Sequence, residues 1–183
     1  ISEEPIFKWE EDLEVPKGHT GEIIVKAAWV TKTYFNRKDV THLAKIPDGE
    51  TFWHRMGDLG KWDEQSRLWF CGRKNHRVLT HAETLFTIPC EALFNKHPDV
   101  RRSALVGIGS GSYHEPVIII EPEDTGRLNK DREIFIRELR EIAATSPQTR
   151  VIKKILFHHD FPVDVRHNAK IFREKLTIWA ENQ

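Results

Sequence analysis

The stretch Leu68-Trp-Phe-Cys-Gly-Arg-Lys-Asn75 separates two differently patterned parts of this 183-residue chain. It reads as an apolar strand that ends at a glycine and continues into a basic segment reaching Arg77. Before it, short β-branched runs alternate with turns rich in proline and glycine. After it, apolar runs of strand length alternate with segments of helical spacing. We therefore place a domain junction near residues 73–76.

The part before the junction is predicted to be a β region. Strands are expected at residues 22–26, 51–55 and 68–71, because these runs are rich in β-branched and aromatic residues. The polar connector Asp63-Glu-Gln-Ser-Arg67 can close a hairpin. The one helical segment expected here is a short turn near residues 39–45. This part therefore supplies strands and very little helix.

The part after the junction is predicted to be an α+β module with a small sheet and two to three helices. Pro89 is expected in the first turn of a helix, where a missing N–H costs nothing. Two further helices are predicted from apolar residues at i, i+4 and i+7, each behind an asparagine cap. These sets are Phe135, Leu139 and Ile142 behind Asn129, and Phe172, Leu176 and Trp179 behind Asn168. Strands are expected at 103–108, 116–120 and 152–157.

Composition excludes several classes of protein. The chain carries 28 Lys and Arg against 28 Asp and Glu, and this zero balance argues against polyanion binding by bulk charge. No apolar run approaches the roughly 20 residues of a membrane span. Two cysteines are too few for a disulfide framework, so a cytoplasmic location is expected. The ten histidines lack metal-like spacing, so no metal site is predicted. The chain opens on Ile1 without a signal peptide, which favours a piece of a longer protein.

A carboxylate stands out in the motif His54-Arg-Met-Gly-Asp-Leu-Gly60. A strand ending in Gly-Asp-x-Gly would present the Asp58 carboxylate at a tight turn. There it could accept hydrogen bonds from both hydroxyls of a vicinal diol such as ribose. An aspartate beside glycine is also ordinary turn chemistry, so this motif alone leaves both interpretations open.

Arg73, Lys74 and Arg77 form a basic cluster directly after the strand. The simplest interpretation is a solvated loop. A nucleic-acid-binding surface is the alternative, but no aromatic stacking platform alternates with the bases. Acidic residues also flank the cluster, namely Asp58, Asp63, Glu64 and Glu83.

The third stretch is Pro162-Val-Asp-Val-Arg-His-Asn-Ala-Lys-Ile-Phe-Arg173. Its pattern predicts a loop led by proline that places Lys170 at the start of the last helix. The helix dipole disfavours a cation at that end, which suggests a group held for an anion. A solvated lysine in a first helical turn is the alternative.

Taken together, in this order and at these separations, the three stretches resemble the C-terminal part of adenylate-forming enzymes. This superfamily includes acyl-CoA synthetases, peptide-synthetase adenylation domains and luciferases. The resemblance runs from about residue 15 to residue 182. It includes Gly21-Glu-Ile-Ile-Val25, which is similar to a family strand, and Tyr34, which is similar to its closing tyrosine.

The resemblance implies a role for each matching residue. Asp58 and Arg73 would bind the ribose hydroxyls of the nucleotide, and Asn75 would be the hinge between a large and a small domain. Lys170 would be the catalytic residue that contacts the reacting carboxylate and phosphate. Residues 1–74 would then be the incomplete, β-barrel-like end of the large domain, and residues 75–183 the small mobile C-terminal lid domain.

The family's phosphate loop and acyl pocket are absent from this sequence. ATP and Mg²⁺ would therefore be bound mainly by the missing part of the large domain, and the fragment alone is expected to be inactive.

One departure from the family pattern bears on the product. Acyl-CoA synthetases carry a lysine, a glycine and a base in the loop after the hinge, where the pantetheine arm passes. Leu79, Ala82 and Thr84 stand at those positions, which puts a role for CoA in doubt. The sequence is similar to the β-lactone synthetase branch of bacterial olefin biosynthesis, in which a hydroxyl of the substrate replaces the external thiol.

That branch implies a fatty-acid-derived substrate. A long-chain 2-alkyl-3-hydroxy acid would be adenylated and cyclised to a β-lactone with release of AMP. The implied pathway partners are a condensing enzyme, a reductase and a decarboxylase, with no nucleic acid. Two alternatives stay open: a fatty acyl-CoA ligase acting through acyl-AMP, and a stand-alone, non-catalytic interaction module.

Overall fold

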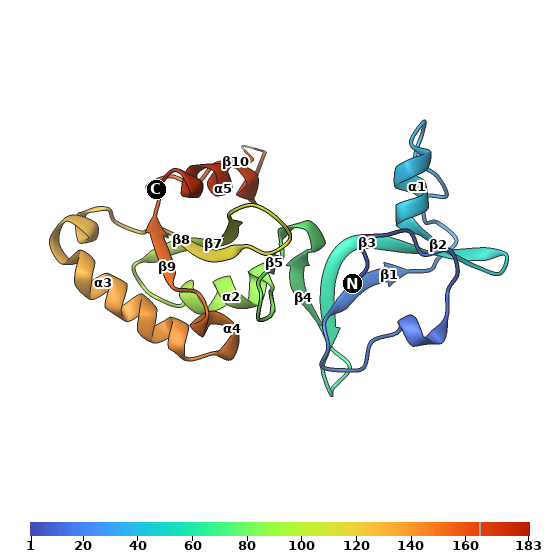
Figure 1. Cartoon of the computed structure of the whole chain (residues 1–183), viewed down its shortest axis with the longest axis horizontal. Coiled ribbons are helices and arrows are strands. Elements are labelled where there is room, and N and C mark those ends of the chain that lie inside the picture. The colour runs from blue at the N-terminus through green and yellow to red at the C-terminus, as the bar shows by residue number, and fades with distance from the viewer. Residues whose placement is uncertain (165) are drawn as a thin grey trace. The chain divides into compact units, whose positions relative to one another are not determined.

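A computed structural model shows the chain folded as two units, Ile1–Asn75 and His76–Gln183 (Figure 1). It describes the backbone of residues 1–164 and 166–183, and the side chains of these residues except 127, 129 and 167–169. Its mixed α+β architecture agrees with the fold class expected from the sequence. No helix in the described part of the chain is long and apolar enough to cross a membrane.

The first unit is built on an antiparallel sheet in the order β1-β3-β2, with β4 paired to the second half of β3. The long strand β3 (Thr51–Trp62) is its centre. The connector at residues 63–67 closes the β3–β4 hairpin as predicted, since the Asp63 carboxylate accepts the Arg67 N–H at 2.8 Å. The remaining elements are η1 (Glu11–Leu13), β1 (Gly21–Val25), α1 (Lys38–Ala44), β2 (Lys45–Asp48) and β4 (Leu68–Arg73).

A buried ion pair connects the strands of the first unit. Arg55 on β3 is 5% exposed, and its Nη2 lies 2.7 Å from Glu22 Oε2 on β1. The same guanidinium donates to the Leu43 carbonyl at the end of α1, at 3.1 Å. Lys74 also reaches Glu22 Oε2, at 3.3 Å, so the residue before Asn75 is anchored to β1.

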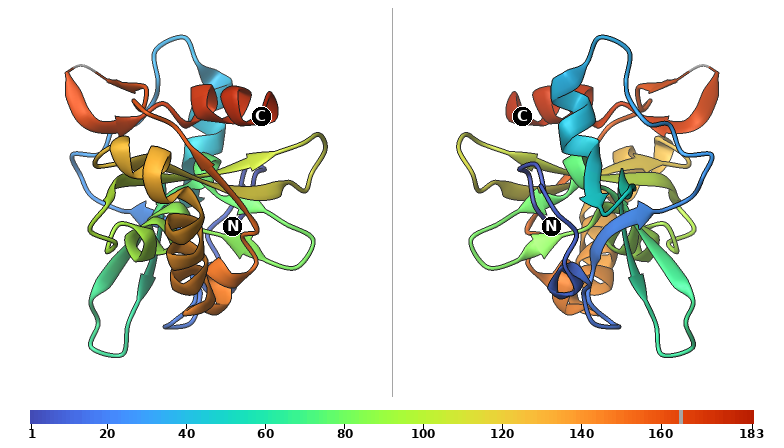
Figure 2. Two further views of the ribbon diagram at one scale, coloured as in Figure 1. Left: turned by 90° about the vertical axis from the view of Figure 1, so that its left-hand side faces the viewer. Right: turned by 90° about the vertical axis from the view of Figure 1, so that its right-hand side faces the viewer.

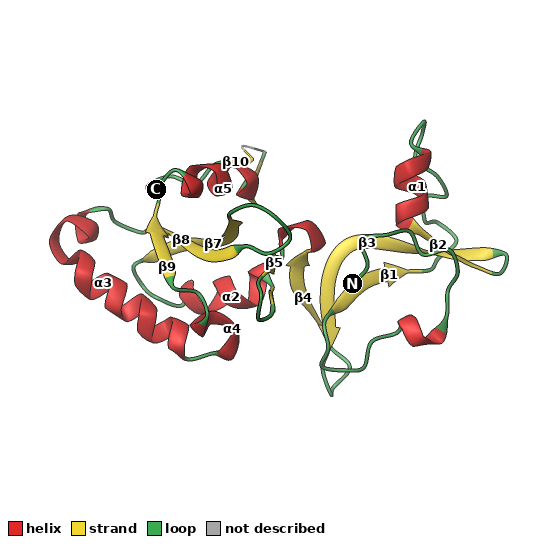
Figure 3. Cartoon of the chain, viewed as in Figure 1, coloured by secondary structure: helices red, strands yellow, loops and turns green. Residues whose placement is uncertain are grey.

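The second unit is built on a sheet in the order β7-β8-β9, with β7–β8 antiparallel and β8–β9 parallel (Figure 3). The hairpins β5–β6 and β10–β11 flank it. The strands are β5 (Val78–Leu79), β6 (Thr84–Leu85), β7 (Val100–Ile108), β8 (Glu115–Pro122), β9 (Lys154–Phe157), β10 (Val163–Asp164) and β11 (His167–Ile171). The helices are α2 (Thr87–Phe94), α3 (Gly126–Ala144), α4 (Pro147–Arg150) and α5 (Arg173–Glu181), and η2 (Lys74–His76) spans the junction.

Helices cover both faces of this sheet (Figures 1 and 2). Alternate side chains of a strand point to opposite faces, which gives the unit two separate apolar clusters. Ile118 and Ile120 of β8 pack with α2 and α3, including Phe135 of the predicted helical face. Val117 and Ile119 of the same strand form a cluster with α5. The fully apolar run of β8 is therefore explained by burial on both sides.

The structure corrects one predicted helix start and shows a kink close to the other. Asn168 was expected to cap the last helix, and its side chain lies outside the described residues, but the backbone of 167–171 is strand β11. The Phe172 N–H donates to the Pro162 carbonyl at 2.8 Å, so the hairpin uses the backbone group that an earlier helix would need. The helix α3 starts earlier, at Gly126, but it is kinked at Asp131 (φ −136°, ψ 33°), two residues after Asn129, whose side chain also lies outside the described residues.

Candidate functional site

Asp58 and Arg73, the two predicted ribose-binding residues, lie side by side in the first unit. They are paired across the β3–β4 ladder, and Arg73 Nη1 lies 3.0 Å from Asp58 Oδ1. The Asp58 side chain is 24% exposed and that of Arg73 is 57% exposed, so a ligand can reach both. The structure thus brings a carboxylate and a guanidinium, an acceptor and a donor for hydroxyl groups, to one point of the sheet surface.

A glycine in the left-handed region precedes each of these residues. Gly57 has φ +68° and Gly72 has φ +119°, and both conformations strain a residue that carries a Cβ. A shift in strand register lies beside them, between Leu59 and Gly60. Such an irregularity re-aims the neighbouring side chains. This explains why both motifs contain a glycine directly before the predicted ribose-binding residue.

The predicted tight turn at Asp58 is wrong. The strand does not end at Gly57 but continues to Trp62, because β4 pairs with it from Asp58 to the end. The positive φ of Gly57 is therefore a local irregularity inside an extended strand. Asp58 lies on the strand surface opposite Arg73, and its position depends on the second strand of the hairpin.

Asn75, the predicted hinge, is exposed and lies in the 3₁₀ turn η2 at the boundary of the two units. Its backbone does not use the left-handed conformation that asparagine tolerates. Among the non-glycine residues that the structure describes, Asn36 and Ser66 have positive φ. The anchored Lys74 directly precedes Asn75, so the chain is fixed to the first unit up to the boundary.

Lys170 is exposed and belongs to the second unit. The prediction that it starts a helix is wrong: it lies in β11, and α5 begins three residues later at Arg173. The pairing of Val163 with Ile171 keeps this segment extended. The Lys170 ammonium lies 5.9 Å from the centroid of the Phe172 ring, a weak cation–π contact. A hairpin strand, rather than a helix terminus, therefore presents this cation.

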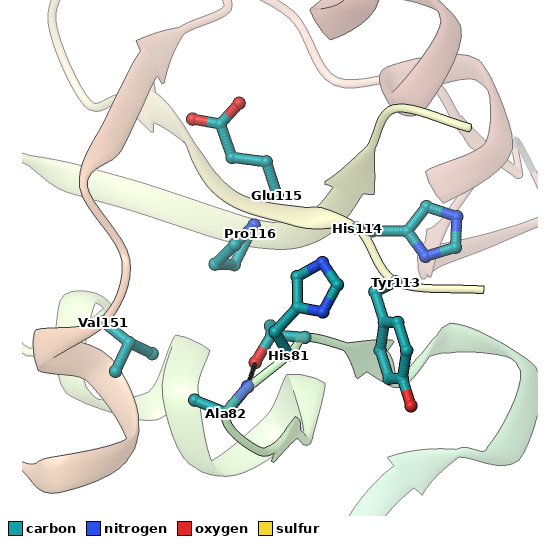
Figure 4. A pocket seen from close by; sticks show the side chains of 8 residues that line it. His81, Ala82, Tyr113, His114, Glu115, Pro116 and Val151 are labelled. Carbon is teal, nitrogen blue, oxygen red and sulfur yellow. Dashed lines mark hydrogen bonds between the residues drawn. The ribbon is translucent and has the colours of Figure 1, made fainter. Parts of the chain in front are cut away.

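The segment containing Leu79, Ala82 and Thr84 forms the β5–β6 hairpin. The Thr80 hydroxyl organises its tip, accepting the N–H of Ala82 at 3.3 Å and donating to the Glu83 carbonyl at 2.7 Å. Beside the tip lies an open pocket of about 390 Å³ (Figure 4). Its walls are Thr80, His81, Ala82, Tyr113, His114, Glu115, Pro116 and Val151.

The aromatic side of this pocket is formed by His81 and Tyr113, whose ring centroids are 4.6 Å apart (Figure 4). The β5–β6 hairpin is also tied to the segment before β8, because the His114 N–H donates to the Leu79 carbonyl at 2.8 Å. The methyl group of Ala82 therefore belongs to an ordered loop with hydrogen bonds on both sides.

The described residues contain no group of three or more His, Cys, Asp or Glu side chains placed to hold a metal ion. The adjacent histidines His158 and His159 stack on each other, with ring centroids 5.3 Å apart, and His158 meets Trp179 edge-on at 4.8 Å. Burial lowers the pKa of His158, which favours the neutral ring in this aromatic setting.

Sequence reasoning missed one charged pair near Lys170. Glu91 Oε2 and Arg173 Nη2 are 2.9 Å apart; the Glu91 side chain is buried, and that of Arg173 is 13% exposed. The available signal was a glutamate inside the apolar stretch Cys90-Glu-Ala-Leu-Phe94 of α2, since an unpaired charge is rarely buried. Its partner could not be named, because the two residues lie 82 positions apart.

The chain is similar in sequence to curated enzymes. It is 45% identical over 188 residues to the olefin beta-lactone synthetase of Xanthomonas campestris, covering 100% of this chain and 34% of that protein. It is 42% identical over 185 residues to the olefin beta-lactone synthetase of Stenotrophomonas maltophilia, covering 98% and 33%. The chain thus spans about a third of the length of these relatives, at their C-terminal end. No protein-family model matches it.

This chain is a homologue of the C-terminal part of adenylate-forming enzymes. Its fold is that of solved members. An amide bond synthetase from Marinactinospora thermotolerans superposes with a TM-score of 0.74 at 23% identity, covering 97% of this chain and 34% of that one. An O-succinylbenzoate Coenzyme A synthetase from Bacillus subtilis, in complex with ATP and magnesium ion, superposes at 0.69 and 21% identity, covering 93% and 33%.

Proposed function

We propose that this chain is the C-terminal part of an ATP-dependent enzyme that converts a long-chain 2-alkyl-3-hydroxy fatty acid into a β-lactone. The observation that carries the proposal is the Asp58–Arg73 pair, a glycine-led carboxylate and guanidinium 3.0 Å apart, in a chain 45% identical to an olefin beta-lactone synthetase. The pair has the donors and acceptors that two ribose hydroxyls require. Its role is to position the nucleotide rather than to react with it.

We assign residues 1–74 to the end of a larger domain and residues 75–183 to a small lid. Three consecutive apolar side chains of β4 support the first assignment, because Leu68, Trp69 and Phe70 are 45%, 52% and 48% exposed. A strand with apolar residues exposed on both faces normally packs against further chain. The anchored Lys74 and the exposed Asn75 make the boundary a suitable hinge.

The first chemical step joins the acid to AMP. A carboxylate oxygen attacks the α-phosphorus of ATP, the bond to the leaving pyrophosphate breaks, and negative charge accumulates around the reacting phosphate. Lys170, exposed on β11, would offset this charge when its hairpin reaches the substrate. Magnesium would neutralise phosphate charge from a site in the rest of the enzyme.

In the second step, the 3-hydroxyl oxygen attacks the acyl carbonyl carbon. The mixed-anhydride bond between the acyl carbon and the phosphate oxygen breaks, AMP departs, and the hydroxyl proton passes to solvent. Because nucleophile and electrophile belong to one molecule, no external thiol has to be bound and oriented. The ordered loop with Leu79 and Ala82 in place of the lysine and glycine of acyl-CoA synthetases fits a step without pantetheine.

The deciding experiment uses the full-length enzyme with ATP, Mg²⁺ and a 2-alkyl-3-hydroxy acid, with and without CoA. We expect AMP and a β-lactone in both reactions, identified by mass spectrometry. A product that forms only with CoA would instead establish the acyl-CoA ligase. A full-length enzyme that forms no acyl-adenylate at all would leave the stand-alone interaction module as the better interpretation.

Lys170→Ala tests the catalytic assignment in the same enzyme. We expect loss of pyrophosphate release with ATP binding retained, because Lys170 acts on the reacting groups while Asp58 and Arg73 hold the ribose. Normal adenylation by this variant would refute the role of Lys170. A cytoplasmic pathway with a condensing enzyme, a reductase and a decarboxylase belongs to the same proposal.

A further inference from the structure

Glu91 and Arg173 form a largely buried ion pair that has no part in the chemistry described above. Glu91 lies on α2 and is 5% exposed. Arg173 is the first residue of α5, and its Nη2 lies 2.9 Å from Glu91 Oε2. The pair therefore connects the helix after the Lys170 strand to a different helix of the same unit.

Both the side-chain carboxylate and the backbone carbonyl of Glu91 accept hydrogen bonds from β7. The Leu105 N–H of β7 donates to Glu91 Oε1 at 2.8 Å, so the carboxylate takes the place of a neighbouring strand at this sheet edge. The Ser103 hydroxyl donates to the Glu91 carbonyl at 3.3 Å. Rotating the carboxylate would break a buried hydrogen bond, which is costly. Glu91 is thus a fixed point to which Arg173 is tied.

A contribution to folding stability does not by itself explain why the Glu91–Arg173 ion pair is present. Desolvation by burial raises the pKa of Glu91 to about 7, in spite of Arg173 and the Leu105 N–H, so the fold disfavours the ionised carboxylate. In the described part of the chain, Arg173 Nη1 is buried without a hydrogen-bond partner. Buried ion pairs are often no more stabilising than apolar residues of similar volume. What the pair does supply is a defined position for the start of α5.

The segment between Lys170 and Arg173 is short and hydrogen-bonded, so the position of Arg173 at the start of α5 also constrains that of Lys170. Two residues, Ile171 and Phe172, separate Lys170 from Arg173. Of these, Ile171 pairs with Val163, and Phe172 donates its N–H to the Pro162 carbonyl at 2.8 Å. We propose that Glu91 and Arg173 are positioning residues, which hold the end of β11 so that Lys170 meets the reacting carboxylate and phosphate. This inference rests on the proposed function.

The test uses the full-length enzyme and compares Arg173→Met with Arg173→Lys. Misplacing a catalytic group by about 1 Å costs on the order of 100-fold in rate, so Arg173→Met should lower kcat for adenylation by about that factor. The KM for ATP should change less than about threefold, because binding is set elsewhere. Arg173→Lys keeps a cation for Glu91 Oε2 and should restore most of the rate. Glu174→Gln, an exposed neighbour on α5, is the matched control.

A double variant separates positioning from a general structural role. If Arg173 acts through Lys170, adding Arg173→Met to Lys170→Ala should cause no further loss. Losses that multiply would overturn the proposal. If Arg173→Met does not fold, as judged by circular dichroism, Glu91→Met/Arg173→Met fills the volume with apolar groups. A folded double variant with low kcat supports positioning, and one with the normal kcat refutes it.

The two proposals can fail separately. Normal adenylation by Lys170→Ala would contradict the proposed function, and the positioning role would fall with it. Loss of adenylation in Lys170→Ala, together with a normal kcat in Arg173→Met, would overturn only the positioning role.

Discussion

The buried carboxylate of Glu91 leads to a quantitative prediction about stability and pH. Burial raises its pKa from 4.5 to about 7 in the folded protein. Each tenfold change in proton affinity corresponds to about 1.4 kcal/mol, so the folded state holds this proton more strongly than the unfolded chain by about 3 kcal/mol. The perturbation is Glu91→Gln, which keeps the shape and an acceptor for the Leu105 N–H but cannot ionise.

The direction of the effect follows from linkage. The folded-state pKa lies above the unfolded value, so the stabilisation is complete below about pH 4.5 and is lost as the pH rises through about 7. The free energy of unfolding of the wild type should therefore fall by about 3 kcal/mol, relative to Glu91→Gln, between those limits. Asp164 and His158 titrate in both proteins, so the comparison cancels their contributions.

Urea unfolding at a series of pH values, followed by circular dichroism at 222 nm, measures this difference. The signal reports mainly on the second unit, where the long helices α2, α3 and α5 lie. A wild-type curve parallel to that of Glu91→Gln would show that the carboxylate has an ordinary pKa. A wild type that gains stability with pH, relative to the variant, would mean that Arg173 outweighs desolvation, and the reasoning would be refuted.

Three further predictions concern binding, product and packing. In the full-length enzyme, Asp58→Asn should raise the KM for ATP by about 10- to 100-fold with little change in kcat, since the ribose hydroxyls lose hydrogen bonds to a charged carboxylate. An unchanged KM would contradict ribose binding by Asp58. Leu79→Lys/Ala82→Gly should introduce detectable CoA thioester, measured by mass spectrometry. Absence of the thioester would show that Leu79 and Ala82 are not what prevents the reaction with CoA. Leu176→Ala, at a fully buried position, should lower the free energy of unfolding by about 2–5 kcal/mol in urea titrations, and a change below about 1 kcal/mol would refute tight packing there.

Local sequence patterns predicted the secondary structure correctly where contacts with distant segments do not override the local preference. The apolar spacing of Phe135, Leu139 and Ile142 placed a helix face correctly, because the period of 3.6 residues reports burial on one side. The polar connector after Trp62 was correctly predicted to close a hairpin. Such features depend on residues within one or two turns of each other.

The errors arose where a distant segment overrides a local preference. Gly57 beside Asp58 suggested a turn, yet β4 keeps the strand extended past both residues. The spacing behind Asn168 suggested a helix, but the pairing of Val163 with Ile171 holds the segment as a strand to Ile171, and the helix begins at Arg173. Both partners lie outside the window in which propensity is read, so no count of residue types could reveal them.

The sequence by itself determined the candidate residues. Asp58, Arg73 and Lys170 are candidates because their motifs, in this order and at these separations, resemble those of adenylate-forming enzymes. The tertiary structure alone decided their geometry. Cross-strand pairing places Asp58 3.0 Å from Arg73, and a buried contact across 82 positions ties Arg173 to Glu91. The chemistry of a site is a property of its side chains, whereas its geometry depends on contacts between segments far apart along the chain.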